Sequence, residues 1–331
     1  MYKIKHLPED FIVKEISKAK IEHNGQYAYF LLKKTNYSTV SALEVLSEKL
    51  RVQLKNFGFA GNKDKNAVTE QKISIFRGSK SFEKIKLDNI ELRYLGNGKE
   101  PISLGDLEGN EFIITIRNLD DKDIKKIKQV QNKKIKIPNL FGPQRFSKNN
   151  HLVGKAIIKK DFRKAVGLLL ENRGNAEEEI KEYMKKNGND FVGALRLIPL
   201  KTRKLFVHSY QSFLFNRILD EFLKGDKELK NAQIPIIGFD FEINSIKNNK
   251  LKRIIQKIVN EEKISPRDFI INQMPELTSE GSFRDLFFEL KSLKIIGISN
   301  DELNPNKQKM TIEFVLPKSC YATTAIEFIF L

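Results

Sequence analysis

The stretch FGFAGNKDKNAVTEQKISIF, residues 57–76, places a polar segment between two apolar ones. Its glycines and its run of Asn, Lys and Asp are typical of a loop. From Lys72 to Phe76 apolar and polar residues alternate again, as they do in a strand with one buried face. The pattern predicts a loop that is anchored at both ends by apolar segments and that presents Asp64 between two lysines.

Regular patterns on both sides of this loop predict mixed α and β structure. Residues 11–16 and 27–33 carry β-branched and aromatic side chains and predict strands. Between residues 38 and 50 apolar residues recur every three to four positions, and Ser41 with Glu44 fits a capping box, so a helix is expected. Downstream, strands are predicted at 112–116, at 310–317 and in the apolar closing run 318–331, and helices at 122–136, 152–195, 205–223 (ended by Gly225) and 247–263.

Composition bounds the class of protein. The 331 residues suggest about two domains, and a chain that is 40% hydrophobic with 24 Phe can bury a core, which excludes disorder. Lys and Arg number 59 against 42 Asp and Glu, for a net charge of +17. This excess favours a polyanionic partner such as RNA or DNA, although a solvated lysine-rich surface gives the same sum.

The sequence predicts neither a metal nor a cofactor. One cysteine permits no internal disulfide and no cysteine-based zinc site, and the four histidines match no zinc-binding spacing. No glycine-rich phosphate or dinucleotide motif occurs. No apolar run reaches the ~18 residues of a membrane span, and the first residues lack a signal-peptide stretch, so a soluble, cytoplasmic protein with no membrane partner is expected.

Asp64 is the first candidate for a reactive group. An aspartate near the usual pKa of ~3.9 is ionised at neutral pH and can act as a nucleophile without a base to activate it. Burial raises the pKa of a carboxyl group, so a catalytic aspartate in a closed pocket needs a cation beside it. The alternative is an exposed turn aspartate that caps residues 65–67.

FAGNKDKNAVTEQ (59–71) resembles the signature loop of the TruD family of pseudouridine synthases, AG-x-KD-x-x-A-x-T-x-Q. Residues 226–295 match the family only loosely, and the last matching segment has Ser319 and Cys320 where Gly-Ser is usual. The other segments that resemble the family, in its order, are LPEDFIVKEI (7–16), LGDLEGNEFIITIR (104–117), NLFGPQRF (139–146), HSYQSFLFN (208–216) and FVLPKSCYAT (314–323).

The resemblance implies that the protein isomerises uridine to pseudouridine in tRNA, at uridine-13. By motif position Asp64 would be the nucleophile, attacking C6 of the base or C1′ of the sugar, and Lys5 would be the basic residue that pairs with it. A stacked uridine must first be flipped out, and aromatic side chains offset the cost by stacking on it. The candidates for this contact are Phe11, Phe141 and Tyr321, with plain core packing as the alternative for Phe11.

Polar residues of the matched segments have supporting roles. Asn139 offers a donor and an acceptor to the uracil edge or the ribose, with a turn-former as the alternative. Gln71 is expected to fix the Asp64 loop, and Gln144 and Arg145 to brace the pocket or contact phosphate. His208 is expected to be structural.

The fold implied is α+β, with a mixed, mostly antiparallel pseudouridine-synthase-like sheet, flanking helices and an inserted α/β domain specific to TruD. The expected catalytic domain comprises residues 1–164 and 295–331, and the insertion 165–294, whose first helices could equally pack with the core. The expected partner is tRNA, with no obligate protein partner and a monomeric state. Two other functions stay open: a non-catalytic tRNA-binding protein, and a base glycosylase or nuclease.

Overall fold

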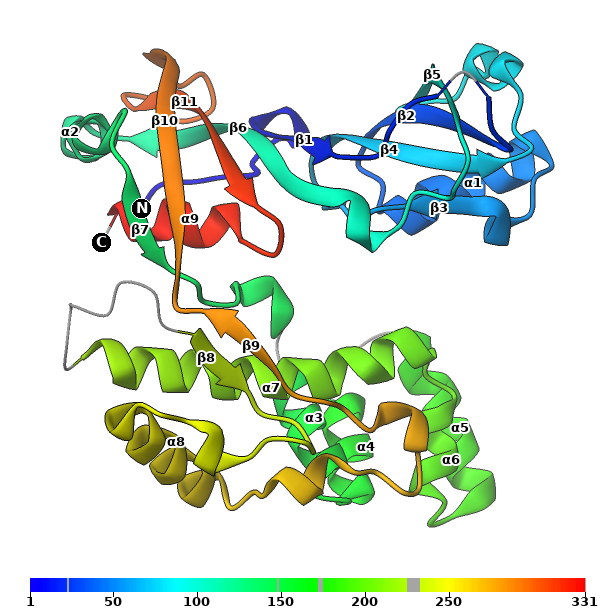
Figure 1. Cartoon of the computed structure of the whole chain (residues 1–331), viewed down its shortest axis with the longest axis vertical. Helices are drawn as coiled ribbons and strands as arrows, with labels where there is room; N and C mark the ends of the chain where they lie inside the picture. Colours follow the sequence, from blue (N-terminus) through cyan, green and yellow to red (C-terminus); the bar gives the residue numbers. More distant parts are fainter. Residues whose placement is uncertain (23, 148, 172–174, 225–232, 331) are drawn as a thin grey trace. The chain divides into compact units, whose positions relative to one another are not determined.

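The computed structural model describes residues 1–330 apart from 23, 148, 172–174 and 225–232 (Figure 1). The chain divides into two compact units. Unit 1 comprises Met1–Ile137 with Phe288–Leu331, and unit 2 comprises Pro138–Phe287. Unit 2 starts earlier in the chain than the predicted insertion, because helices on both sides of residue 165 share its core. The assignment of catalytic and insertion domains stays a prediction.

Unit 1 is built on one mixed sheet, which has nine strands among the described residues. The strands are β1 (Phe11–Ser17), β2 (Tyr27–Thr35), β3 (Phe57–Phe59), β4 (Val68–Phe76), β5 (Ile90–Gly98), β6 (Leu107–Leu119), β7 (Ile135–Pro138), β10 (Phe287–Asn300) and β11 (Gln308–Pro317). Their order is β5-β2-β4-β1-β6-β11-β10-β7, with β3 beside β4. β1 pairs with β4 in parallel, whereas β6 pairs with β1 and β11, and β2 with β4 and β5, in antiparallel register.

Alternation along the strands gives this sheet its buried faces. In β2 Ala28, Phe30 and Leu32 are at most 2% exposed, and they pack in one apolar cluster with α1 (Thr39–Leu50). The helix predicted at 38–50 is confirmed, but its predicted capping box is wrong. Ser38 Oγ accepts a hydrogen bond from Ser41 N at 3.0 Å, so Ser38 is the N-cap.

The predicted strand in the closing run is also wrong, because residues Ala322–Phe330 form helix α9. Its buried residues Ala322, Ala325, Ile326 and Ile329 recur at helical spacing and pack in the cluster that contains β6 and β11. The β-branched residues of the run suggested a strand, but its buried residues form one stripe only in a helix. A further helix of unit 1 is α2 (Asp121–Val130), so the predicted helix at 122–136 is confirmed as far as Val130 and is wrong beyond it, where strand β7 begins at Ile135.

Unit 2 is mainly helical, with a two-stranded antiparallel sheet of β8 (Gln233–Ile236) and β9 (Ser282–Asp285). Its longest helix, drawn in yellow-green in Figure 1, confirms the predicted helix at 205–223 and extends it at its start, while Gly225 lies outside the described residues. The helices are α3 (Asn150–Ile158), α4 (Phe162–Leu170), α5 (Asn175–Asn187), α6 (Phe191–Arg196), α7 (Leu200–Leu223) and α8 (Asn249–Glu262).

The core of unit 2 forms around α7. Phe206, Tyr210 and Leu214 are at most 5% exposed and lie on one stripe of this helix. Gly154 of α3 allows the two helices to approach closely, because a Cβ at this position would lie 2.0 Å from the carbonyl oxygen of Phe206. None of the helices in the described part of the chain is long and apolar enough to cross a membrane.

Candidate active site

Asp64 lies in the segment 60–67 between β3 and β4, here called the Asp64 loop. Hydrogen bonds to the side chains of Thr39 and Gln71 hold this loop in place. Lys63 N donates to Thr39 Oγ1 at 2.9 Å, Thr39 Oγ1 donates to Gln71 Oε1 at 2.8 Å, and Gln71 Nε2 donates to the carbonyl oxygen of Gly61 at 3.2 Å. Thr39 and Gln71 are both fully buried, so the loop conformation is set by strand β4 and the first residue of α1.

The side chain of Asp64 faces Lys5. Lys5 Nζ lies 2.8 Å from Asp64 Oδ2, and the two side chains are 14% and 35% exposed. The same ammonium lies 4.2 Å from the centroid of the Phe11 ring, a cation–π distance. The carboxylate is therefore reachable from solvent while a cation holds it in place, which is the arrangement that an ionised nucleophile requires.

Phe11 lies deeper than Lys5. Its side chain is 1% exposed and contacts the ring of Phe112 edge-on at 6.0 Å in the core of unit 1. The Phe11 ring therefore packs directly against the ammonium of the Lys5–Asp64 ion pair. Tyr321, the other aromatic residue predicted in unit 1, lies half-buried directly before α9.

A buried arginine holds the chain segment that leads from Lys5 to Phe11. Arg117 Nε donates to both carboxylate oxygens of Asp10, at 2.9 and 2.8 Å, and Arg117 Nη1 donates to Asp301 Oδ1 at 2.9 Å. The hydrogen bond to Asp10 is the main reason why the pKa of the Arg117 guanidinium is raised. The guanidinium is 3% exposed, so the start of β1 is tied to β6 by a charged group that solvent hardly reaches.

A second buried ion pair lies beside the Asp64 loop. Lys63 Nζ is 2.8 Å from Glu15 Oε2, and the side chains are 5% and 0% exposed. Lys63 therefore points into the protein, where Glu15 of β1 neutralises it. The two lysines that flank Asp64 in sequence thus differ, because Lys65 is exposed.

The predicted residues Asn139, Phe141, Gln144 and Arg145 all lie in unit 2. The Asn139 amide is 6% exposed: its Nδ2 donates to the carbonyl oxygen of Asp285 at 3.0 Å, and its Oδ1 accepts from Arg284 Nη2 at 2.5 Å. Both polar atoms of this amide are thus bound to unit 2 itself, and its predicted role in recognising the uracil or the ribose stays a prediction.

Phe141 is held by residues from distant parts of unit 2. The Arg284 guanidinium lies 4.2 Å from its ring centroid, and the Phe215 ring meets it edge-on at 5.3 Å. Asn216 fixes its main chain, because the amide accepts from Phe141 N at 2.9 Å and donates to Phe141 O at 3.0 Å. Arg145 Nε donates to the Ser212 hydroxyl at 3.2 Å. The half-buried Phe141 ring thus packs against Phe215 of α7 and contacts the Arg284 guanidinium.

Gln144 and His208 are two further residues of unit 2 for which the sequence predicts a supporting or structural role. Gln144 is exposed in the short turn of 3₁₀-helix Pro143–Arg145. Burial lowers the pKa of His208, and the charges of Arg145 and Lys204 lower it further.

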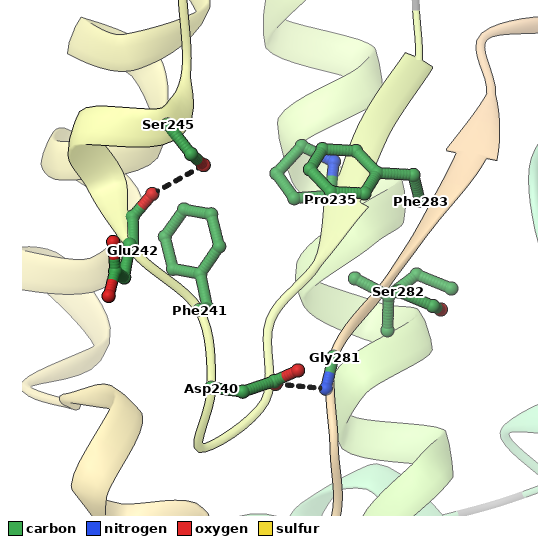
Figure 2. A pocket seen from close by; sticks show the side chains of 9 residues that line it. Pro235, Asp240, Phe241, Glu242, Ser245, Gly281, Ser282 and Phe283 are labelled. Atoms are coloured by element: carbon green, nitrogen blue, oxygen red, sulfur yellow. Dashed lines mark hydrogen bonds between the residues drawn. The ribbon is translucent and has the colours of Figure 1, made fainter.

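Unit 2 also contains a pocket of about 290 Å³ beside β8 and β9. Figure 2 shows that Asp240, Phe241 and Phe283 line it, and Asp240 Oδ1 accepts a hydrogen bond from Gly281 N at 2.6 Å. None of the residues predicted from the sequence line this pocket. Among the described residues, no group of three or more His, Cys, Asp or Glu could hold a metal ion.

A family model described as tRNA pseudouridine synthase D (TruD) matches residues 2–182, 169–234 and 226–327. The chain belongs to the TruD family. The family and the α+β fold class predicted from the sequence are therefore confirmed. As a TruD protein the chain is an enzyme, an isomerase of the tRNA pseudouridine synthase class.

Curated TruD relatives match along most of their length. The Methanosarcina acetivorans protein named "Probable tRNA pseudouridine synthase D" is 31% identical over 96% of this chain and 90% of its own. The Aquifex aeolicus "tRNA pseudouridine synthase D" is 28% identical, covering 99% and 98%. Among solved structures, that of the Methanosarcina mazei protein named "tRNA pseudouridine synthase D (TruD)" resembles this one with a TM-score of 0.74 and 29% identity, covering 99% of this chain and 93% of that one.

Sequence reasoning missed two charged residues that contact the predicted TruD site residues. Lys34 Nζ donates to the carbonyl oxygen of Asp64 at 3.0 Å, and Arg284 binds Asn139 and Phe141 as described. A signal existed for Lys34, because it continues the inward-facing phase of Phe30 and Leu32 in β2. Arg284 lies in the segment that resembles the family only loosely, and no pattern singled it out.

Proposed function

We propose that the protein converts uridine-13 of tRNA to pseudouridine, with Asp64 as the nucleophile and the target base turned out of the RNA stack. The observation that carries the proposal is the Lys5–Asp64 pair at 2.8 Å, in a loop that buried hydrogen bonds fix. An ionised carboxylate that is partly open to solvent and backed by an ammonium can attack a carbon atom without a base to activate it. Its place in the segment 59–71, which resembles the TruD signature loop, supports the same role.

The reaction is an isomerisation and needs no second substrate. Asp64 Oδ attacks C6 of the base or C1′ of the sugar, and the N1–C1′ bond breaks. The uracil then turns and C5 bonds to C1′. The C5 proton leaves as the aspartate is released, and N1 takes up a proton, so the product is an isomer of the substrate. The Lys5 ammonium would hold the carboxylate before the attack and after its release.

Extrusion of the base follows from the chemistry. A carboxylate on a folded protein cannot reach C6 or C1′ of a uridine that is stacked in a helix, so the nucleotide must leave the stack at a cost of a few kcal/mol. Stacking on an aromatic ring offsets about 1–3 kcal/mol per base. Tyr321 and Phe141, both half-buried, are the proposed rings.

The binding part of the proposal rests on charge. A net charge of +17 suits a tRNA substrate, whose phosphates would bind lysine and arginine side chains. We infer that the enzyme acts as a monomer in the cytoplasm, where its substrate is found. Sedimentation of the free protein at micromolar concentration tests the monomer directly, and a dimer would contradict it.

The variant Asp64→Asn tests the nucleophile. Unmodified tRNA transcript is incubated with enzyme, and pseudouridine is mapped by carbodiimide treatment and primer extension. Asp64→Asn should give no product at position 13 while it still binds tRNA, because only the attacking oxygen is lost. Asp88→Asn, an exposed aspartate of the same unit, is the matched control and should keep full activity.

Other outcomes separate the alternatives. Product from Asp64→Asn at the wild-type rate would overturn the proposed nucleophile. Free uracil in place of pseudouridine would indicate a glycosylase. A transcript with cytidine at position 13 should give no product, and pseudouridine elsewhere in that transcript would overturn the proposed site specificity.

A further inference from the structure

Lys34 is a lysine without solvent contact. Its side chain is 0% exposed, and it follows Phe30 and Leu32 on the inward face of β2. A buried ammonium is costly unless hydrogen bonds satisfy it. Lys34 Nζ donates to the carbonyl oxygen of Tyr37 at 2.6 Å and to that of Asp64 at 3.0 Å. The Tyr37 contact lies in the turn before α1, so the ammonium joins that turn to the Asp64 loop.

Two lysines therefore hold Asp64 from different sides. Lys34 binds its main-chain carbonyl from inside the unit, and Lys5 binds its carboxylate at 2.8 Å near the surface. The neighbouring Lys63 does not share this role, because its Nζ is paired with Glu15 at 2.8 Å. Rotation of the Asp64 peptide would break the contact with Lys34 and would move the carboxylate away from Lys5.

We propose that Lys34 is a positioning residue of the pseudouridine synthase reaction, which fixes the main chain of Asp64 so that its carboxylate keeps a reactive orientation. The inference rests on the proposed role of Asp64 as the nucleophile. Nothing in the geometry brings Lys34 to the substrate, because the side chain lies beneath the loop. Its effect should therefore appear in the chemical step and not in tRNA binding.

The charge of Lys34 gives a second readout. Burial lowers its pKa to about 8; the charge of Asp64 opposes this shift, and that of Lys63 adds to it. Its strand partners Thr69 on β4 and Ile90 on β5 carry no charge. Loss of the proton near pH 8 removes the ammonium that attracts the Asp64 carbonyl, so the rate of the wild-type chemical step should fall above this pH.

The test compares Lys34→Met with Lys33→Met. Lys33 is the next residue on the same strand, but its side chain is 43% exposed on the opposite face. Single-turnover rates with saturating enzyme and tRNA dissociation constants are measured from pH 6.5 to 9.5. We expect Lys34→Met to lower the rate on the order of 10- to 100-fold, with tRNA affinity within about twofold and without the decline near pH 8. Lys33→Met should match the wild type in all three.

A folded Lys34→Met protein with the wild-type rate would overturn the inference. Circular dichroism and thermal unfolding establish that the variant is folded. If Lys34→Met does not fold, Lys34→Gln, which keeps a donor but no charge, takes its place. A wild-type rate that stays level from pH 7 to 9.5 would also overturn the inference, and this measurement needs no variant.

Asp64→Asn, assayed in parallel, separates this inference from the proposed function. An active Asp64→Asn enzyme means that the proposed nucleophile has failed, and the role of Lys34 fails with it. An inactive Asp64→Asn enzyme beside a fully active Lys34→Met enzyme means that only the inference about Lys34 has failed.

Discussion

Lys5 Nζ lies 2.8 Å from Asp64 Oδ2, although the two residues belong to segments that are far apart in sequence. Lys5 has a positive φ of 55°, a conformation that is uncommon for residues other than glycine. Just before it, Lys3 and Arg117 of β6 exchange two backbone hydrogen bonds, of 2.9 and 2.8 Å. The ion pair is thus built into the start of the sheet.

Lys5→Met should lower the single-turnover rate on the order of 10- to 100-fold, because the carboxylate loses the cation that orients it. The stem of the new side chain still covers Phe11, so the fold should hold. Lys3→Met is the control, since Lys3 Nζ donates to Asn304 Oδ1 at 2.7 Å and not to Asp64. Equal rates for Lys5→Met and the wild type would show that the ion pair has no part in the reaction.

Lys63→Met should destabilise the protein by about 3–5 kcal/mol, because it leaves the Glu15 carboxylate buried without its cation. Urea unfolding gives the free energy. The double variant Glu15→Gln with Lys63→Met should recover part of the loss, which a double-mutant cycle quantifies. Lys14→Met removes the partly exposed pair with Glu111, at 3.8 Å, and should cost at most about 1 kcal/mol. Similar losses at the two sites would contradict the importance of burial.

Arg117→Met should also cost about 3–5 kcal/mol, because Asp10 and Asp301 then lose a shared buried partner. Arg117→Lys should recover only part of this, since one ammonium cannot copy the fork that binds both carboxylates. Arg93→Met on the exposed side of β5 is the control. Thermal and urea unfolding measure the effect, and a fully stable Arg117→Met protein would contradict it.

Lys34 should make the stability depend on alkaline pH. Its pKa is about 8 in the folded protein and about 10.5 when unfolding exposes it, so the unfolded chain binds more protons between these values. The free energy of unfolding contributed by this group therefore rises with pH across this window, by about 3 kcal/mol in all. Urea unfolding of the wild type and of Lys34→Met is measured from pH 7.5 to 10.5. The free energy of unfolding of the wild type, relative to that of Lys34→Met, should rise with pH. Lys33→Met should follow the wild type, and a constant difference would contradict the shift.

Affinity for tRNA should fall steeply with salt, because phosphate contacts release bound counterions. A plot of log affinity against log salt concentration should be linear, with a slope of roughly −0.7 to −0.9 per phosphate contact. Filter binding or fluorescence anisotropy between 50 and 300 mM KCl measures it. Little dependence on salt would contradict a largely electrostatic interface.

The parts of the fold that the sequence predicted well are those in which one pattern repeats. From Phe30 to Lys34 β2 buries every second residue, and α7 carries a buried stripe at every fourth residue from Phe206 to Phe222, so alternation and helical spacing locate them. The closing run was predicted wrongly because a short apolar run with β-branched residues suits a buried strand as well as a helix. Which of them applies depends on the packing of α9 against the sheet, and this packing is not a local property.

The candidate site was predictable where a residue lies in a matched motif. Lys5 and Asp64 were chosen in this way, and the structure brings them into contact. Lys34 was not chosen: its phase with Phe30 and Leu32 indicates that it faces inward, but its contact with the Asp64 carbonyl depends on how the Asp64 loop folds over β2. Arg284 meets Asn139 from 145 positions later in the chain, and no local pattern relates such residues.

The pairing of β6 with β11 makes unit 1 discontinuous in sequence. Phe112 and Phe314 are strand partners, although all of unit 2 lies between them in the sequence. During synthesis on the ribosome β6 emerges long before its partner strand and has to wait with one edge exposed. Every residue of unit 2 has left the exit tunnel before β11 does, so unit 2 can fold first and the nascent sheet closes last. The scaffold that carries the carboxylate is thus completed only after all of unit 2 has been synthesised.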